Sequence, residues 1–228
     1  MTIKEVWTLL EQNKDERGIT HWKRTGIHTM ESYGIGLTKL KNLGKRIGKD
    51  HSLALELWKT NNYDAKTLSI IIDDPAKITR EQVNDQIGDL EFWMLSHSYC
   101  SILLPKVPFM KELSEEWMHN PDPLRRKCGY LLLYQIAKDN KTLENPFFEE
   151  YLKIIRDSLQ SEENFVKDAM NNALLMIGQR NKYLNEKALD VAKSIGEVVV
   201  DYGDNSCQAA NCITHLSSER IRKKVGLI

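Results

Sequence analysis

Residues 51–75 read HSLALELWKTNNYDAKTLSIIIDDP, and this stretch decides the fold. It holds one amphipathic segment, a polar turn at Asn61 and Asn62, a second apolar segment, and a stop at Asp74 and Pro75. Apolar residues recur three and four positions apart in both segments, which is the spacing of a helix with one buried face. The stretch therefore predicts an antiparallel pair of helices joined by a short turn.

The same arrangement recurs along the chain. Residues 79–108, 108–140 and 145–181 each hold two amphipathic segments separated by a turn signal. Self-similarity with a period of about 35 to 40 residues is typical of helical-repeat arrays. The sequence therefore predicts an all-α solenoid of antiparallel helix pairs, in a single domain over residues 1–228. Such a stack curves and offers a long concave face that suits an extended partner.

Capping signals place many helix boundaries. Thr79 followed by Gln82 fits a capping box. Two further pairs predict an N-cap and a first helical proline, namely Asp122–Pro123 and Asn145–Pro146. Three glycines mark predicted helix ends: Gly178, Gly196 and Gly203. Three helices are expected near residues 2–13, 15–26 and 36–47. Four or five pairs then follow to residue 217, with a loose tail after them.

Composition and the N-terminal residues predict where in the cell the protein is found. The chain has 228 residues, of which 41% are hydrophobic and 28% charged, as in soluble folded proteins. Its longest apolar runs fall well short of the roughly 20 residues that cross a bilayer. Lys4, Glu5 and Glu11 stand where a signal peptide needs an apolar run. We therefore expect a cytoplasmic monomer with no membrane partner.

The cysteines and glycines do not predict a metal or a cofactor. The chain has four cysteines, and we expect them to be reduced, because no export signal precedes them. Cys207 and Cys212 are five positions apart, but no second ligand pair lies near them in the sequence. The sequence also lacks a phosphate-cradling glycine loop and a nucleophile elbow. We therefore expect no metal and no cofactor.

Charge is balanced in total and clustered along the sequence. The 32 basic and 32 acidic residues cancel, but clustering matters more for nucleic-acid binding than the sum. The basic clusters are Lys39, Lys41, Lys45, Arg46 and Lys49; Arg125, Arg126 and Lys127; and Arg220, Arg222, Lys223 and Lys224. The acidic clusters fall on other predicted helices. This separation favours one positive face.

Several blocks together resemble the bacterial DNA alkylation repair proteins of the AlkD-like type. The blocks are YGIGLTKLKNLGKRIGKDHSLALELWKTNNYDAKTLSIIIDDP (33–75), LEFWMLSHSYC (90–100), RRKCGYLLLY (125–134) and FVKDAMNNALLMIGQRN (165–181). The resemblance implies a crescent of HEAT-like helix pairs that binds DNA. It also implies release of cationic bases such as 3-methyladenine or 7-methylguanine. In active members a carboxylate stabilises the sugar as it gains positive charge, and aromatic faces hold the cation.

This chain departs from active members at the positions that the resemblance assigns to catalysis. The aromatic residue is kept as Trp93, but the Asp expected one helical turn later is His97. The usual Arg is Lys127, with Arg126 beside it, and a Trp position holds Asn172. A neutral imidazole supplies no fixed negative charge, and a protonated one repels the transition state. We therefore expect base excision to be weak or absent.

The leading hypothesis is a protein that grips the DNA backbone, in duplexes that are damaged or branched. The candidate phosphate contacts are Arg125, Arg126, Lys127, Lys167, Arg180 and Lys182. Three basic residues at the start of one helix oppose the helix dipole, which hints at an anionic partner. Two alternatives stay open, namely an active glycosylase and a protein-binding scaffold. Individually, Trp93 could be a core aromatic, and the lysines near residue 40 could be the solvated side of their helix.

Overall fold

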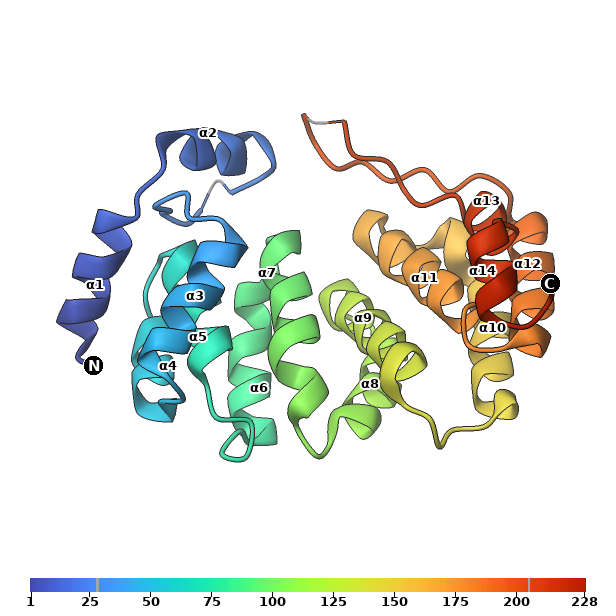
Figure 1. The fold of residues 1–228 in the computed structure, drawn as a ribbon, viewed down its shortest axis with the longest axis horizontal. Helices are drawn as coiled ribbons and strands as arrows, with labels where there is room; N and C mark the ends of the chain where they lie inside the picture. Colours follow the sequence, from blue (N-terminus) through green and yellow to red (C-terminus); the bar gives the residue numbers. More distant parts are fainter. Residues whose placement is uncertain (28, 205) are drawn as a thin grey trace. The chain divides into compact units, whose positions relative to one another are not determined.

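A computed structural model describes residues 1–27, 29–204 and 206–228. This part of the chain holds fourteen α-helices and no β-strand, which confirms the all-α prediction (Figure 1). Its one extended pairing is an isolated parallel bridge between Glu31 and Asn62. Within the described ranges, every helix is too short or too polar to cross a bilayer.

The chain divides into two compact units. The first comprises Met1–Pro108 and Tyr202–Ser206, and the second comprises Phe109–Asp201 and Cys207–Ile228. The chain therefore leaves the second unit, adds a short piece to the first, and returns. The single domain over residues 1–228 stays a prediction.

The first unit holds seven α-helices. They are α1 (Ile3–Gln12), α2 (Glu16–Arg24), α3 (Leu37–Ile47), α4 (His51–Trp58), α5 (Tyr63–Ile72), α6 (Arg80–Gln86) and α7 (Trp93–Ser98). A 3₁₀ turn (Ile87–Leu90) joins α6 to α7, and a π turn (Tyr99–Leu103) and a second 3₁₀ turn (Leu104–Lys106) follow α7. Helix α5 packs against α3, α4 and α7, so the predicted pairing of α4 with α5 is confirmed.

The core of the first unit forms from the apolar faces that the sequence pattern predicts. Leu40 and Leu43 of α3, Leu53 and Leu57 of α4, and Leu68 of α5 belong to one buried cluster. Burying each such side chain contributes about 1.5 to 3 kcal/mol relative to leaving it exposed. The helices are therefore held mainly by packing against one another, because each is too short to be stable alone.

A buried carboxylate anchors the loop between α2 and α3. Asp64 is fully buried, and its Oδ2 accepts hydrogen bonds from the Ser32 hydroxyl at 2.8 Å and the Tyr33 N–H at 2.7 Å. Its Oδ1 accepts from the Ile35 N–H at 2.9 Å. Burial raises the pKa of Asp64 above its usual value, and these donors oppose that rise. The start of α5 thereby fixes the backbone of residues 32–35.

The anchored loop in turn packs closely on α2. A Cβ on Gly18 of α2 would lie 2.0 Å from the carbonyl oxygen of Gly34, so no larger side chain fits there. Gly34 itself has φ of 73°, a conformation that favours glycine. The close approach of α2 to this loop therefore depends on two glycines.

The second unit holds the remaining seven α-helices. They are α8 (Met110–Met118), α9 (Pro123–Asp139), α10 (Asn145–Ser158), α11 (Asn164–Ile177), α12 (Lys182–Ile195), α13 (Cys212–Leu216) and α14 (Glu219–Lys224), with a 3₁₀ turn (Leu159–Ser161) after α10. Helix α9 packs against both α8 and α11 and is buried around much of its circumference. Helix α11 also contacts α10, α12 and α13.

Several predicted boundaries are confirmed. Asp122 caps α9 by accepting from the Leu124 N–H, and Pro123 is the first helical residue. Gly178 and Gly196 are the C-caps of α11 and α12. Thr79 accepts the predicted hydrogen bond from the Gln82 N–H at 3.1 Å. The polar side chains accept hydrogen bonds from free N–H groups at helix starts, and the glycines end helices, as their local sequence predicts.

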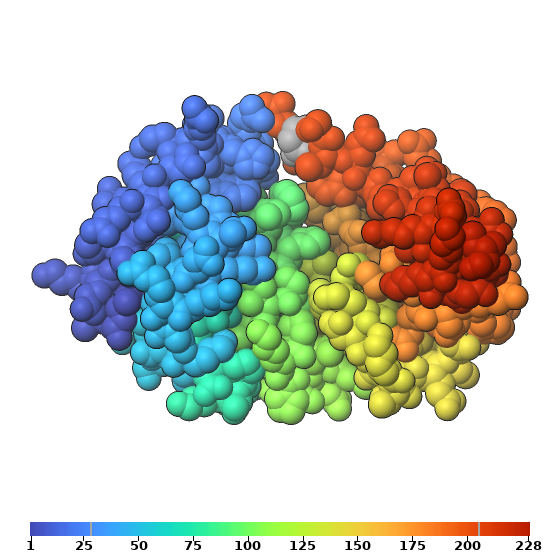
Figure 2. Space-filling model, in the orientation of Figure 1, coloured from blue at the N-terminus to red at the C-terminus, as the bar shows by residue number. Residues whose placement is uncertain are grey.

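Other boundary predictions are wrong. Asn145 is the first residue of α10 rather than its cap, which is Glu144. Gln82 does not complete a capping box, because its amide donates to Asp73 Oδ2 instead. Gly203 ends no helix and lies among the described non-helical residues 196–204 that follow α12. The tail predicted to be loose forms α14, with Ile221 buried, and Figure 2 shows this red C-terminal part on the surface of the second unit.

We predict that Asp64→Asn lowers the free energy of unfolding by about 2 kcal/mol, because both carboxylate oxygens accept from backbone N–H groups. An amide would place an N–H₂ group against one of those donors. Urea denaturation followed by tryptophan fluorescence measures the change. Asp190→Asn, at an exposed position on α12, is the control and should shift stability by less than about 0.5 kcal/mol. Equal effects of the two substitutions would contradict the anchoring role.

Candidate nucleic-acid interface

Trp93 opens α7 and is half-buried. Its indole N–H donates to the carbonyl oxygen of Thr25, the C-cap of α2, at 3.2 Å. The π turn that follows α7 begins at Tyr99, two residues after His97. Widened turns of this kind recur at functional sites because they change the direction of the side chains around them. The position of the ring therefore depends on both α7 and α2.

Aromatic rings surround Trp93 on several sides. The His97 ring stands perpendicular to it, with centroids 5.9 Å apart. The Tyr202 ring, from the inserted segment, lies 6.0 Å away at an angle of 65°. Phe92 lies 6.2 Å away and continues the cluster to Tyr63 at 5.4 Å. The group offers half-buried π surface of the kind that stacks on bases or holds a cation.

The chemistry of this cluster differs from that of a glycosidic-bond-cleaving site. Such a site needs a carboxylate beside the sugar, because the sugar becomes an oxocarbenium ion in the transition state. His97 occupies the position one turn after Trp93 on the same helix. Its imidazole carries either no charge or a positive one. The rings of this cluster therefore offer π faces, and the ring-bearing residues described in it supply no carboxylate.

The other two residues that the resemblance assigns to catalysis belong to the second unit. Lys127 on α9 is buried, with 5% of its surface exposed, and its ammonium lies 6.0 Å from the centroid of the Phe165 ring. Asn172 on α11 is half-buried, and its amide donates to the carbonyl and the carboxylate of Asp168, each at 2.9 Å. Asp168 is itself buried. Both residues are thus tied into the packing of α9 and α11.

Arg126 is engaged within the second unit. Its guanidinium forms a two-pronged ion pair with Glu162, with a shortest distance of 2.8 Å, and it donates to the carbonyl oxygens of Asn120 and Pro121. Hydrogen bonding to Glu162 raises the pKa of Arg126. Arg125 lies 3.8 Å from Asp122 and 5.9 Å from the centroid of the Trp117 ring. These contacts order the start of α9.

Arg180 is also turned into the protein. Its guanidinium donates to the carbonyl oxygen of Ala137, within the last turn of α9, at 2.6 Å and to that of Asn140, just beyond this turn, at 2.8 Å. It stacks over the Phe148 ring, 4.0 Å from the centroid. Burial lowers the pKa of Arg180. The side chain satisfies carbonyl groups that the end of a helix leaves unpaired.

Other cations are not engaged in this way. Lys182 is exposed and Lys167 half-buried, and neither forms an ion pair with a described residue. In the first unit the exposed cations of α3 are also without ion pairs to described residues, namely Lys39, Lys41, Lys45 and Arg46. Figure 2 shows α3, in light blue, on the face of the first unit that is turned to the viewer. The contacts do not test the predicted phosphate-binding residues, which stay a prediction.

Sequence reasoning missed three contributors to these groups. Tyr202 is 109 positions from Trp93 and lies in a segment without helical pattern, so no local signal joins the two. Thr25 acts through its backbone carbonyl, which sequence does not distinguish. Asp168 lies one helical turn before Asn172, and that spacing could have revealed it.

Comparison with known proteins identifies the family and two relatives of this chain. A family model described as DNA alkylation repair enzyme matches residues 6–204. The uncharacterised protein Lin0241 of Listeria innocua is 29% identical over 228 residues, covering 97% of this chain and 99% of its own length. The uncharacterised protein Lmo0209 of Listeria monocytogenes is 29% identical over 230 residues, covering 98% of this chain and 100% of its own.

A solved structure is similar over nearly the whole chain. It represents a new family of proteins related to the HEAT-like repeat DNA glycosylases, with affinity for branched DNA structures. The TM-score is 0.89 at 25% sequence identity, and the match covers 99% of this chain and 97% of that one. The HEAT-like helix pairs that the sequence predicts are therefore confirmed.

We predict that Arg180→Gln lowers the free energy of unfolding by about 2 kcal/mol, because a charge-assisted donor to buried carbonyl groups is lost. Lys167→Gln, which removes a cation without a described ion-pair partner, should leave stability within about 0.5 kcal/mol of the original. Urea denaturation checks both. Unchanged stability of Arg180→Gln together with weaker DNA binding would instead support the phosphate contact predicted for Arg180.

Proposed function

This chain belongs to the DNA alkylation repair enzyme family, and on that premise we propose that it binds the backbone of DNA, with branched DNA as its preferred form. The similarity to a structure whose family has affinity for branched DNA structures carries this proposal. That similarity extends over both units rather than over one helix pair. We further propose that excision of alkylated bases is weak or absent.

Unengaged cations supply the grip on phosphates. Lys41 and Lys45 lie one turn apart on α3, and both are exposed. Helix α3 packs on α5, which also packs on α7, the helix that carries Trp93. Contacts to phosphate give affinity without reading sequence, whereas an aromatic cluster can stack on bases left unpaired at a branch. Recognition of this kind depends on the shape of the DNA.

Three side chains, Arg126, His97 and Lys127, support the proposal that excision does not accompany binding. Arg126 is committed to Glu162, and the turn after Trp93 carries His97 in place of a carboxylate. Lys127 is buried at the position where active members present a cation. The groups that would stabilise the charges of base release are thus replaced or held within the protein.

We predict that Lys41→Gln with Lys45→Gln weakens binding to a four-way DNA junction and lowers the steepness of its salt dependence. Each phosphate contact contributes about 0.9 to the slope of log K against log salt, so the slope should fall by about one per lysine that contacts phosphate. Fluorescence anisotropy from 50 to 200 mM salt, roughly, covers the informative range.

Lys187→Gln with Lys193→Gln is the matched control, because both lysines are exposed on α12 and neither is a candidate contact. This control should leave the slope unchanged. A junction affinity no greater than that for a duplex of the same sequence would remove the preference for branched DNA. Binding that does not depend on salt would remove the phosphate grip as well.

We predict no release of 7-methylguanine above the protein-free rate when the protein is incubated with a methylated duplex and abasic sites are scored. The physical reason is the missing carboxylate beside the sugar. His97→Asp restores a carboxylate one turn from Trp93 and should give measurable release. Efficient excision by the unaltered protein would support the alternative of an active glycosylase.

A further inference from the structure

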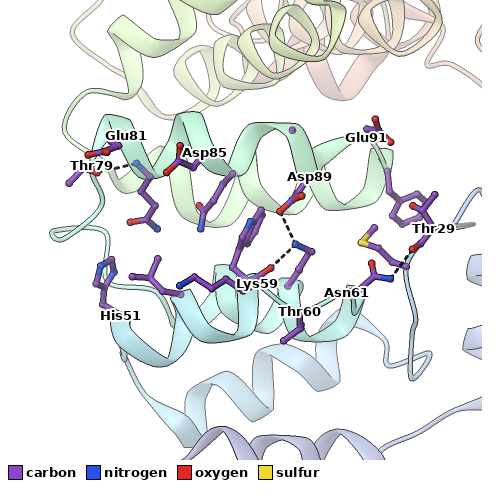
Figure 3. Close-up of a pocket in the computed structure, with 18 of the residues that line it drawn as sticks. Thr29, His51, Lys59, Thr60, Asn61, Thr79, Glu81, Asp85, Asp89 and Glu91 are labelled. Carbon is purple, nitrogen blue, oxygen red and sulfur yellow. Dashed lines mark hydrogen bonds and ion pairs between the residues drawn. The ribbon is translucent and has the colours of Figure 1, made fainter.

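A groove of about 830 Å³ lies in the first unit between α4 and the helix formed by α6 and its 3₁₀ extension. These two helical segments form the walls of the groove. Figure 3 shows four acidic residues along the α6 wall and its continuation, namely Glu81, Asp85, Asp89 and Glu91. The apolar lining of the groove comes from Leu55 and Trp58 of α4, from Met30 and from Phe92. The lining includes no residue of α3 or α7 in the part of the chain that the structure describes.

One acidic residue of the wall is neutralised and the others are not. Asp89 Oδ2 accepts from the ammonium of Lys66 at 2.8 Å, and this lysine is buried, with its charge 4.9 Å from the Trp58 ring centroid. Glu81 and Asp85 are exposed and form no ion pair or hydrogen bond through their carboxylates with any described residue. They lie four residues apart, so their carboxylates share one face of α6.

A buried amide adds a hydrogen-bond donor to the lining. Gln86 is only 4% exposed, and its Oε1 accepts from the Tyr99 hydroxyl at 2.7 Å. Because that contact holds the oxygen inward, the amide nitrogen is left for the groove, and no described residue accepts from it. This amide nitrogen is therefore available to donate to an acceptor that enters the groove.

Two pairs of residues fix the ends of the groove. His51 Nδ1 lies 2.6 Å from Asp73 Oδ1, and Asp73 also accepts from the Gln82 amide. At the other end, the Asn61 amide donates to the Thr29 carbonyl oxygen at 3.0 Å. The walls are therefore held in place before any ligand arrives.

We propose that this groove binds a short protein segment that carries lysine or arginine beside apolar residues. Such a segment satisfies the three features of the lining at once. Its cations pair with Glu81 and Asp85, its apolar side chains cover Trp58 and Leu55, and its backbone carbonyl accepts from Gln86. An aliphatic polyamine has no acceptor for Gln86. The lining also holds Lys59 and Lys77, but the unpaired carboxylates of Glu81 and Asp85 disfavour a polyanion such as nucleic acid along the α6 wall. The wall from Glu81 to Glu91 is about 15 Å long, which matches about five extended residues.

The test begins with a displayed library of random twelve-residue peptides selected on the full chain. We expect the enriched peptides to carry lysine or arginine beside apolar residues. One enriched peptide, labelled with fluorescein, is then measured by anisotropy. Glu81→Gln with Asp85→Asn should weaken its binding at least tenfold. Glu186→Gln with Asp190→Asn is the matched control, since these acids have the same spacing on exposed α12, and it should leave binding unchanged.

Gln86 supplies a second readout that a nonspecific charge effect would not move. The resonance of its side-chain amide should shift on addition of the peptide, because its N–H₂ group gains an acceptor. The proposal is overturned if no enriched peptide distinguishes the acidic wall from the control. It is also overturned if the enriched peptides are acidic, or if spermidine at equal charge concentration or junction DNA displaces the peptide. Peptide selection and peptide affinity are measured without DNA. Loss of the DNA-binding proposal would therefore leave this one standing, and failure of the peptide to bind would leave DNA binding untouched.

Discussion

The buried carboxylate of Asp64 is the contact on which the first unit depends. It draws three donors from residues 32–35 onto the start of α5. The loop held in this way contacts α2 at Gly34 and Gly18, where the two backbones approach too closely for any side chain to fit between them. Helix α2 then presents the Thr25 carbonyl to the Trp93 indole. A desolvated charge is tolerated here because its neighbours supply hydrogen bonds, and the position of the aromatic cluster follows from it.

Cations that are bonded within the protein stabilise its fold, whereas cations exposed at the surface are available to bind a partner. Arg126 and Arg180 donate to carboxylate and carbonyl groups, so their charges stabilise helix ends. Lysines such as Lys41 and Lys45 keep their charge at the surface, where it acts over a distance set by salt. Planar guanidinium groups suit the first role because they make several directed hydrogen bonds at once. The zero net charge therefore does not distinguish the arginines that stabilise the fold from the exposed lysines that are proposed to contact DNA.

Much of the fold could be predicted because its signals are local. Helix spacing, the Asp122–Pro123 start of α9 and the Gly178 end of α11 act within one or two turns. The site could be predicted only in part. Trp93 and His97 are one turn apart on α7, and their proximity follows from spacing. The contact of Trp93 with Tyr202 is set by tertiary packing, as is the Gln82 bond to Asp73 that replaced a capping box.

The insertion of Tyr202–Ser206 into the first unit has a consequence for how this protein can be divided. A fragment that stops at Pro108 retains every helix of that unit but lacks the ring that lies beside Trp93. The repeats are therefore not interchangeable modules, even though each is a similar helix pair. Recombination of halves between relatives would preserve the architecture and lose a wall of the aromatic cluster, unless the donor of the C-terminal half brought a matching side chain.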